Sequence, residues 1–240
     1  MTAFRSILFN VFLFGSLTVF LFGAVLLLPL PERFMERAIT GWTHVARRGL
    51  KLIVGLDYEI RGREHLPDGP AILASKHQSA WDTMAFLWLF PRPVYVIKKE
   101  LLSIPLWGWC ATRCGHIPVD RAGGAGALKR MVRASRDALA KGRHVVIFPE
   151  GTRVAPGEKH PFHPGVAALY AQTSVPVVPV ALNSGVFWGR RSFQKRPGTI
   201  VLEFLPAIPP GLDRKAFIGE LERRLETAAD RLIREARQAA

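Results

Sequence analysis

The chain opens with a long apolar run, which ends at a pair of prolines. From Ile7 to Leu30 there are 24 consecutive residues without a charge, interrupted by only one strongly polar side chain, Asn10. Such a run is long enough to cross about 30 Å of hydrocarbon. It is long for the apolar part of a signal peptide, and no A-x-A-like cleavage site follows it. We therefore predict a membrane segment over residues 1–31, with a cleaved signal peptide or a buried core helix as the alternatives.

An amphipathic stretch follows over residues 32–56. Apolar side chains recur near helical spacing from Phe34 to Val54, and arginine and lysine side chains are interspersed among them. The pattern fits a helix that lies at a membrane surface. It fits equally well a helix that packs its apolar face on a domain core, so the sequence leaves both interpretations open.

Short runs of β-branched and aromatic residues then alternate with helical patterns. Strands are predicted at residues 58–62, 71–75, 94–97, 116–119, 144–148, 177–182 and 200–204. Helices are predicted at residues 80–89, 106–113, 127–140, 165–172 and 214–239. This alternation predicts a single α/β domain over residues 57–240, built on a mixed sheet with helices on both faces.

Glycines and prolines change what is predicted for two of these segments. Gly123, Gly124 and Gly126 lead into a predicted helix without the spacing of a phosphate-binding P-loop, and we interpret them as a mobile loop. Residues 175–182 have the pattern of a buried apolar strand that contains two prolines. Because proline cannot donate a ladder hydrogen bond, this strand is predicted to lie at an edge or to contain a bulge.

Composition narrows the possible partners but does not select one. Lys and Arg total 33 against 19 Asp and Glu, and the formal net charge of +14 attracts phosphate-bearing molecules of any kind. Two cysteines, Cys110 and Cys114, are too few for a disulfide framework and lack the second ligand pair of a zinc site. No RNA- or DNA-binding motif is present, but charge alone keeps a basic membrane-surface or nucleic-acid-binding module as an alternative to an enzyme.

The most informative segment is residues 76–83, KHQSAWDT, directly after a predicted strand. His77 could act as a general base at neutral pH, taking the proton from a hydroxyl as it attacks a thioester carbonyl. Asp82 is the candidate carboxylate to hold the other ring nitrogen. Their contact requires the turn to finish near Ser79 and a helix to begin there, with Ser79 and Asp82 at capping-box spacing. That cap is also the alternative interpretation, in which neither residue is catalytic.

Residues 148–153, FPEGTR, form a second polar turn after an apolar strand. The backbone at Gly151 can approach a ligand closely, Arg153 can bind phosphate through two hydrogen bonds, and Thr152 offers another donor. Glu150 could hold a hydroxyl of the substrate or position Arg153. The alternative is a polar turn with an internal Glu–Arg pair.

A third polar segment lies between these two. Residues 115–121, GHIPVDR, have a strand pattern that ends in Asp120 and Arg121. Arg121 would supply a second cation for the same phosphate if the ends of the strands converge.

The ordered set of blocks resembles the glycerolipid acyltransferase family. The matching blocks are HQSAWD at 77–82, GHIPVDR at 115–121, FPEGTR at 148–153 and VVPV at 177–180. Each block alone is a weak or moderate signal, but their order makes the resemblance specific. It implies that His77 activates an acceptor hydroxyl and Asp82 orients His77, without a covalent enzyme intermediate.

The resemblance implies a reaction and a location. A fatty acyl group would pass from acyl-CoA or acyl-carrier protein to the free hydroxyl of 1-acylglycerol-3-phosphate, giving phosphatidic acid for phospholipid biosynthesis. The enzyme would bind membrane lipids, with its catalytic domain on the cytoplasmic side of a bacterial inner membrane. No metal, redox cofactor or nucleic acid is implied.

The resemblance also implies a pocket for the phosphate of the acceptor. Its residues would be Lys99, Arg121, Glu150, Gly151, Thr152 and Arg153. One position departs from the family pattern, because many relatives carry Asn before the motif histidine where this chain has Lys76. Lys76 would disfavour protonation of His77 if it pointed into the site and would matter little if it pointed outward. This departure keeps another lysolipid, such as a lyso-ornithine lipid, as an alternative acceptor.

Overall fold

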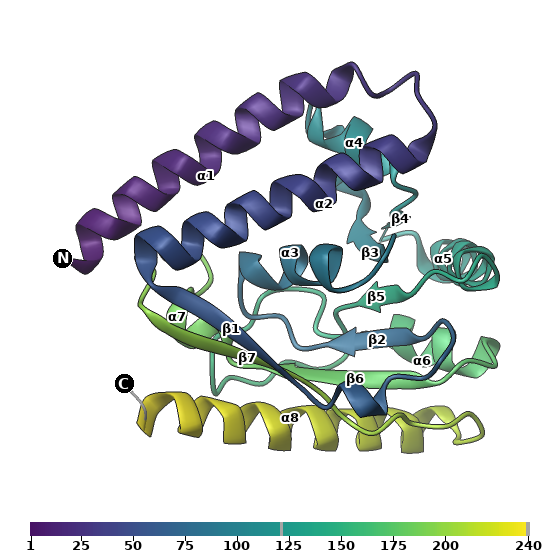
Figure 1. Cartoon of the computed structure of the whole chain (residues 1–240). Helices are drawn as coiled ribbons and strands as arrows, with labels where there is room; N and C mark the ends of the chain where they lie inside the picture. Colours follow the sequence, from purple (N-terminus) through teal and green to yellow (C-terminus); the bar gives the residue numbers. More distant parts are fainter. Residues whose placement is uncertain (121, 239–240) are drawn as a thin grey trace.

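A computed structural model describes residues 1–120 and 122–238 (Figure 1). Its centre is a seven-stranded sheet with the order β1-β7-β6-β2-β5-β3-β4. All neighbouring strands are parallel except β6 and β7, which are antiparallel. The strands are β1 Leu56–Arg61, β2 Ile72–Ser75, β3 Val94–Lys98, β4 Ile117–Val119, β5 Val145–Ile147, β6 Val177–Leu182 and β7 Gly198–Phe204. The predicted mixed sheet is confirmed.

Helices cover both faces of this sheet, as the alternating pattern predicted. Those described are α1 Thr2–Val25, α2 Glu32–Gly49, α3 Ala80–Leu89, α4 Trp107–Arg113, α5 Gly124–Ala140, α6 Pro164–Gln172, α7 Ser184–Phe187 and α8 Arg214–Gln238. Helix α3 connects β2 to β3 in one direction along the sheet, whereas α5 and α6 connect β4 to β5 and β5 to β6 in the other direction. Right-handed crossovers therefore place α3 on one face and α5 and α6 on the opposite face.

Side chains that alternate along β2 and β5 fill separate cores on the two faces of the sheet. Leu73 and Val146 belong to the cluster that contains α2 and α3 residues. Their neighbours Ile72 and Val145 belong to the cluster that contains residues of α5, α6 and α8. Every residue of β2 is buried because both of its faces are covered.

The glycines before α5 do not form the predicted loop. Helix α5 begins at Gly124, so Gly124 and Gly126 lie in its first turn. The sequence predicted the helix only from residue 127, because glycine is a poor helix former and the periodic apolar residues begin after Gly126. The packing of Ala127 and Met131 on the core stabilises the helix in spite of these glycines.

The two prolines of the predicted strand mark a bulge and not an edge. Strand β6 lies inside the sheet, between β7 and β2. On its β7 side, pairing passes from Val180↔Phe204 to Val177↔Ile208, so three steps along β6 (180 to 177) face four steps on the partner (204 to 208). The extra residue is a β-bulge. On this side Pro179 has no N–H to donate, and its carbonyl accepts the N–H of Leu205 at 2.9 Å. On the β2 side it keeps the regular pairing with Ala74.

Helices α1 and α2 form a hairpin over the α3 side of the sheet (Figure 1). The apolar side of α2 is buried on the domain, although Phe34 and Val45 remain exposed. Phe9 and Leu13 of α1 join the same core, but most of the helix is exposed. By length and composition α1 is a candidate membrane span. Its exposed apolar surface indicates that the protein associates with a membrane.

Candidate active site

The predicted site residues follow the carboxyl ends of four neighbouring parallel strands. His77 follows β2, Glu150 to Arg153 follow β5, Lys99 follows β3 and Asp120 follows β4. Parallel neighbours end at the same edge of a sheet, which is where open α/β sheets bind ligands. The predicted convergence of these loops at one edge is therefore present. Arg121, the second predicted phosphate ligand, lies outside the described residues.

The turn after β2 ends at Ser79, which is the N-cap of α3. Ser79 Oγ accepts the backbone N–H of Trp81 at 3.2 Å, and Asp82 Oδ2 accepts the N–H of Ser79 at 2.8 Å. The same Asp82 oxygen lies 3.0 Å from His77 Nδ1. The sequence left the helix cap and the contact with His77 as alternatives, but the same Asp82 oxygen makes both. The cap brings the carboxylate to the histidine.

Asp82 is completely buried and is surrounded by donors. Besides His77 and Ser79, its Oδ2 accepts the backbone N–H of Gln78 at 2.7 Å, and its Oδ1 accepts the hydroxyl of Ser184 at 2.6 Å. These hydrogen bonds stabilise the carboxylate and fix its orientation. An acceptor at Nδ1 holds the proton of neutral His77 on that nitrogen and leaves Nε2 as the basic one.

The ring of His77 is also held from one face by Phe148. The two ring centroids are 4.0 Å apart and the planes are inclined by 20°. The His77 side chain keeps 13% of its surface exposed, and among the described residues no hydrogen bond reaches its Nε2. The histidine is therefore oriented in advance, with its basic nitrogen available to a substrate.

Lys76 points into the protein interior, between the turn that carries His77 and α8. It is 2% exposed, and its ammonium forms ion pairs with Glu150 and, at 2.8 Å, with Glu226. Burial opposes its charge, but the two carboxylates outweigh burial and raise the pKa of Lys76 above the ordinary 10.5. The sequence suggested that Lys76 points either into the site or outward, and it predicted neither its burial nor its two ion pairs.

Glu150 is placed inside the protein by this network. Its side chain has no exposed surface; one oxygen holds Lys76 and the other accepts the backbone N–H of His77 at 3.0 Å. The carboxylate thus positions the turn that carries His77, and its burial keeps it from the surface that a substrate would contact. The internal pair between Glu150 and Arg153, considered from the sequence, is absent from the ion pairs of the described residues.

The next three residues of this block remain at the surface. Gly151 has φ of +64°, a conformation that favours glycine and lets the chain turn outward. Thr152 and Arg153 are partly exposed. Among the described residues, the guanidinium of Arg153 forms no ion pair, so it can bind an external anion.

Lys99 contributes to the same edge in a different way. Its half-exposed ammonium forms an ion pair with Asp120, which joins the ends of β3 and β4. The hydrogen bond from Lys99 holds the pKa of Asp120 below its ordinary value. Lys99 is therefore a shared cation, and a phosphate would have to compete with Asp120 for it.

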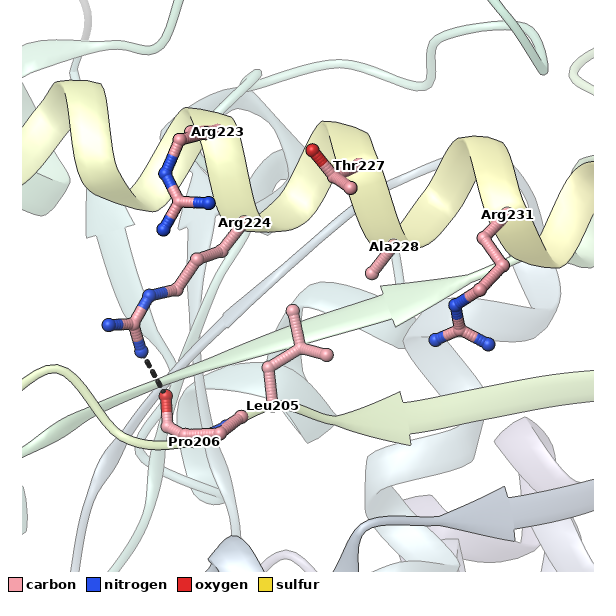
Figure 2. Close-up of a pocket in the computed structure, with 7 residues that line it drawn as sticks. All are labelled: Leu205, Pro206, Arg223, Arg224, Thr227, Ala228 and Arg231. Carbon is pink, nitrogen blue, oxygen red and sulfur yellow. Dashed lines mark hydrogen bonds between the residues drawn. The ribbon is translucent and has the colours of Figure 1, made fainter.

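A surface hollow of about 350 Å³ lies elsewhere, between α8 and the chain that follows β7 (Figure 2). Three arginines line it, and each has a partner. Arg223 and Arg224 pair with Glu220, Arg224 also donates to the carbonyl of Pro206, and Arg231 pairs with Glu203. Because these cations are already paired and lie on α8, we do not assign the substrate phosphate to this hollow.

Comparisons with known proteins agree with the ordered blocks. Residues 57–183 match the acyltransferase family. The chain is 34% identical over 230 residues to a 1-acyl-sn-glycerol-3-phosphate acyltransferase of Pseudomonas aeruginosa, covering 93% of this chain and 88% of the relative. An enzyme of the same description from Limnanthes alba is 33% identical over 84% of this chain and 72% of its own length.

The fold has a similar counterpart among solved structures. It is the crystal structure of a 1-acyl-sn-glycerophosphate acyltransferase from Thermotoga maritima, with a TM-score of 0.78 and 22% sequence identity. The similarity covers 97% of this chain and 98% of that one. It therefore includes the α1–α2 hairpin as well as the sheet.

Proposed function

Because the chain belongs to the acyltransferase family, we propose that it transfers a fatty acyl group from acyl-CoA or acyl-carrier protein to the free hydroxyl of 1-acylglycerol-3-phosphate, giving phosphatidic acid. The observation that carries this proposal is the contact between His77 Nδ1 and buried Asp82 at the strand edge. The description of the Pseudomonas aeruginosa relative supports the choice of acceptor.

In the proposed reaction, His77 Nε2 takes the proton of the acceptor hydroxyl as its oxygen attacks the thioester carbonyl. Asp82 stabilises the imidazolium that forms. The tetrahedral intermediate then collapses, breaks the carbon–sulfur bond and expels the thiolate, which receives the proton from His77. An ester and a free thiol result, and His77 is neutral again. We propose that no metal or redox cofactor takes part, since proton transfer and acyl transfer balance without one.

The proposed phosphate pocket follows β3, β4 and β5. Arg153 and Thr152 are the partly exposed donors, and Lys99 adds a cation that it shares with Asp120. Arg121 keeps its predicted role as a further phosphate ligand. Glu150 acts by holding the turn, and Gly151 lets the backbone turn toward the ligand.

Acceptor choice is tested by comparing initial rates on 1-acylglycerol-3-phosphate, a lyso-ornithine lipid and a monoacylglycerol, with one acyl donor. We expect the phosphorylated acceptor to be preferred, because a lipid without phosphate leaves the cations of the pocket unpaired. A preference for the lyso-ornithine lipid would show that this lipid, and not 1-acylglycerol-3-phosphate, is the acceptor. Absence of any acyl product would favour a basic binding module, for which the His77–Asp82 pair would have no use.

Arg153→Ala is expected to raise the apparent KM for the phosphorylated acceptor about 10-fold or more, because hydrogen bonds to charged groups contribute about 1.5–3 kcal/mol. The KM for the acyl donor should change little. Steady-state kinetics with each substrate varied in turn measures both constants. Lys159→Ala, an exposed cation on the same loop, is the matched control. An unchanged acceptor KM would remove Arg153 from the phosphate role.

We further propose that the catalytic domain lies on the cytoplasmic side of a bacterial inner membrane, where acyl-CoA and acyl-carrier protein are found. The exposed side of α1 would provide the contact with lipid. Phe14→Asp combined with Phe22→Asp should release most of the protein from vesicles, because both rings are exposed and a carboxylate is costly in hydrocarbon.

Vesicle sedimentation in high salt measures this release. Leu212→Asp, which adds a carboxylate at an exposed apolar residue far from α1 in the chain, is the control and should sediment like the wild type. Full sedimentation of the α1 variant would show that another surface holds the membrane.

A further inference from the structure

One face of α5 carries a row of cations that the proposed reaction does not use. Lys129, Arg130, Arg133 and Arg136 are all exposed. At about 100° per residue these positions fall within an arc of about 120°. The buried residues of α5, such as Met131 and Ala138, occupy the opposite side of the helix. We call these four exposed side chains the α5 basic face.

The four cations of the α5 basic face form no ion pair with another residue in the part of the chain that the structure describes. Asp137, the one acidic residue of the helix, falls within the same arc, and Arg130 helps Lys99 to lower the pKa of Asp120. Four cations against one carboxylate still leave the face with an excess of positive charge. On α8, by contrast, the arginines of Figure 2 are each paired with a glutamate of the same helix or of β7. Unpaired like charges in a row repel one another, so an acidic partner would be attracted strongly.

Its position argues against membrane lipid as that partner. Residues of α5 pack in the cluster of α6 and α8, on the face of the sheet opposite to α2 and α3. The hairpin of α1 and α2 lies over the α3 side (Figure 1). Because the hairpin and α5 cover opposite faces of the sheet, we expect a flat bilayer against α1 to leave the α5 basic face in solution. This placement favours a partner that approaches from solution.

The helix also leads directly to the catalytic edge. Strand β4 ends at Val119, and α5 begins at Gly124. The N-terminal end of α5 is thus close to the edge at which His77 and Arg153 lie, and the basic face extends from there. A protein docked along α5 would hold a group attached to it beside the site.

We propose that the α5 basic face docks an acidic carrier protein that delivers the acyl group as a thioester. This inference rests on the proposed function and adds to it a binding surface for the donor. Charge complementarity of this kind acts mainly by speeding association and orienting the partners. It predicts that the surface matters for a protein-bound donor and not for acyl-CoA, which has no protein to dock.

The test is the full-length variant Arg133→Glu with Arg136→Glu, assayed with acyl-carrier protein and with acyl-CoA that bear the same acyl chain. At low salt we expect kcat/KM for acyl-carrier protein to fall about 10-fold or more, because reversed charges both lose attraction and add repulsion. The value for acyl-CoA should stay within about twofold. Arg234→Glu with Arg237→Glu reverses the same charge on exposed residues of α8 and should leave both donors unaffected.

Direct binding of the carrier protein, measured by isothermal titration, separates this inference from the proposed reaction. Loss of binding in the α5 variant alone supports the docking surface even if neither donor is turned over, whereas that lack of turnover would overturn the proposed function. Unchanged binding and kinetics with acyl-carrier protein would overturn the docking surface. So would equal losses with both donors, or a loss of binding to anionic vesicles in place of the carrier protein.

Discussion

His77→Ala should lower kcat by about 10²–10⁴-fold, the usual effect of losing a positioned general base. An alcohol is a poor nucleophile at neutral pH, and Nε2 of His77 is the basic atom that Asp82 and Phe148 hold in place. The protein should fold and reach the membrane normally, because the ring is at the surface edge of its site. Initial rates of ester formation and circular dichroism measure the two properties.

The matched control for this prediction is His160→Ala, which removes an exposed histidine from the loop after the Arg153 block. It should keep the wild-type rate. If His77→Ala retained more than about a tenth of that rate, against the magnitude typical of a general base, His77 would not be the base. The contact with Asp82 would then serve only the cap of α3.

Lys76→Met should cause the largest loss of stability, about 3–5 kcal/mol in the free energy of unfolding, since it leaves two buried carboxylates without their cation. Activity should fall as well, because Glu150 holds the backbone of His77. Because the pKa of Lys76 is raised in the folded state, its charge contributes fully to the free energy of unfolding below pH 10.5. This contribution is lost as the pH rises through the raised pKa. Urea unfolding at about pH 7.5 therefore measures the full contribution of Lys76 to the free energy of unfolding.

Glu226→Gln provides the comparison for this buried network. It keeps the ion pair between Lys76 and Glu150 and removes one negative charge, so its cost should be near 1 kcal/mol, as for an ordinary hydrogen bond. Equal losses in the two variants, or a loss below about 1 kcal/mol for Lys76→Met, would contradict the account of a shared buried cation.

Local patterns predicted the elements because they report local causes. Helix α3 was placed at residues 80–89, since a capping residue, a carboxylate three positions later and a following apolar run all act within one turn. The same local reasoning predicted that His77 and Asp82 could meet only if the turn ended at Ser79, and it does. The strands were found because residues covered on both faces form short apolar runs.

Partners that come from distant parts of the chain were not predicted. Ser184 and Glu226 contact the segment that carries His77, although they lie 102 and 150 residues along the chain from their partners Asp82 and Lys76. The available signals were weak: Ser184 follows the VVPV strand, and Glu226 is a carboxylate beside the buried residues of α8. The position of β6 inside the sheet likewise depends on strand order, which the two prolines could not reveal.

The central claim is that His77 and Asp82 act as one unit in forming phosphatidic acid. It is tested by the initial rate of phosphatidic acid formation, followed by mass spectrometry, in the wild type, His77→Ala, Asp82→Asn and the double variant. We predict that the wild type makes phosphatidic acid, that each single variant loses most activity, and that the double variant is about as slow as His77→Ala alone. A double loss equal to the product of the two single losses, or no phosphatidic acid from the wild type, would contradict the account.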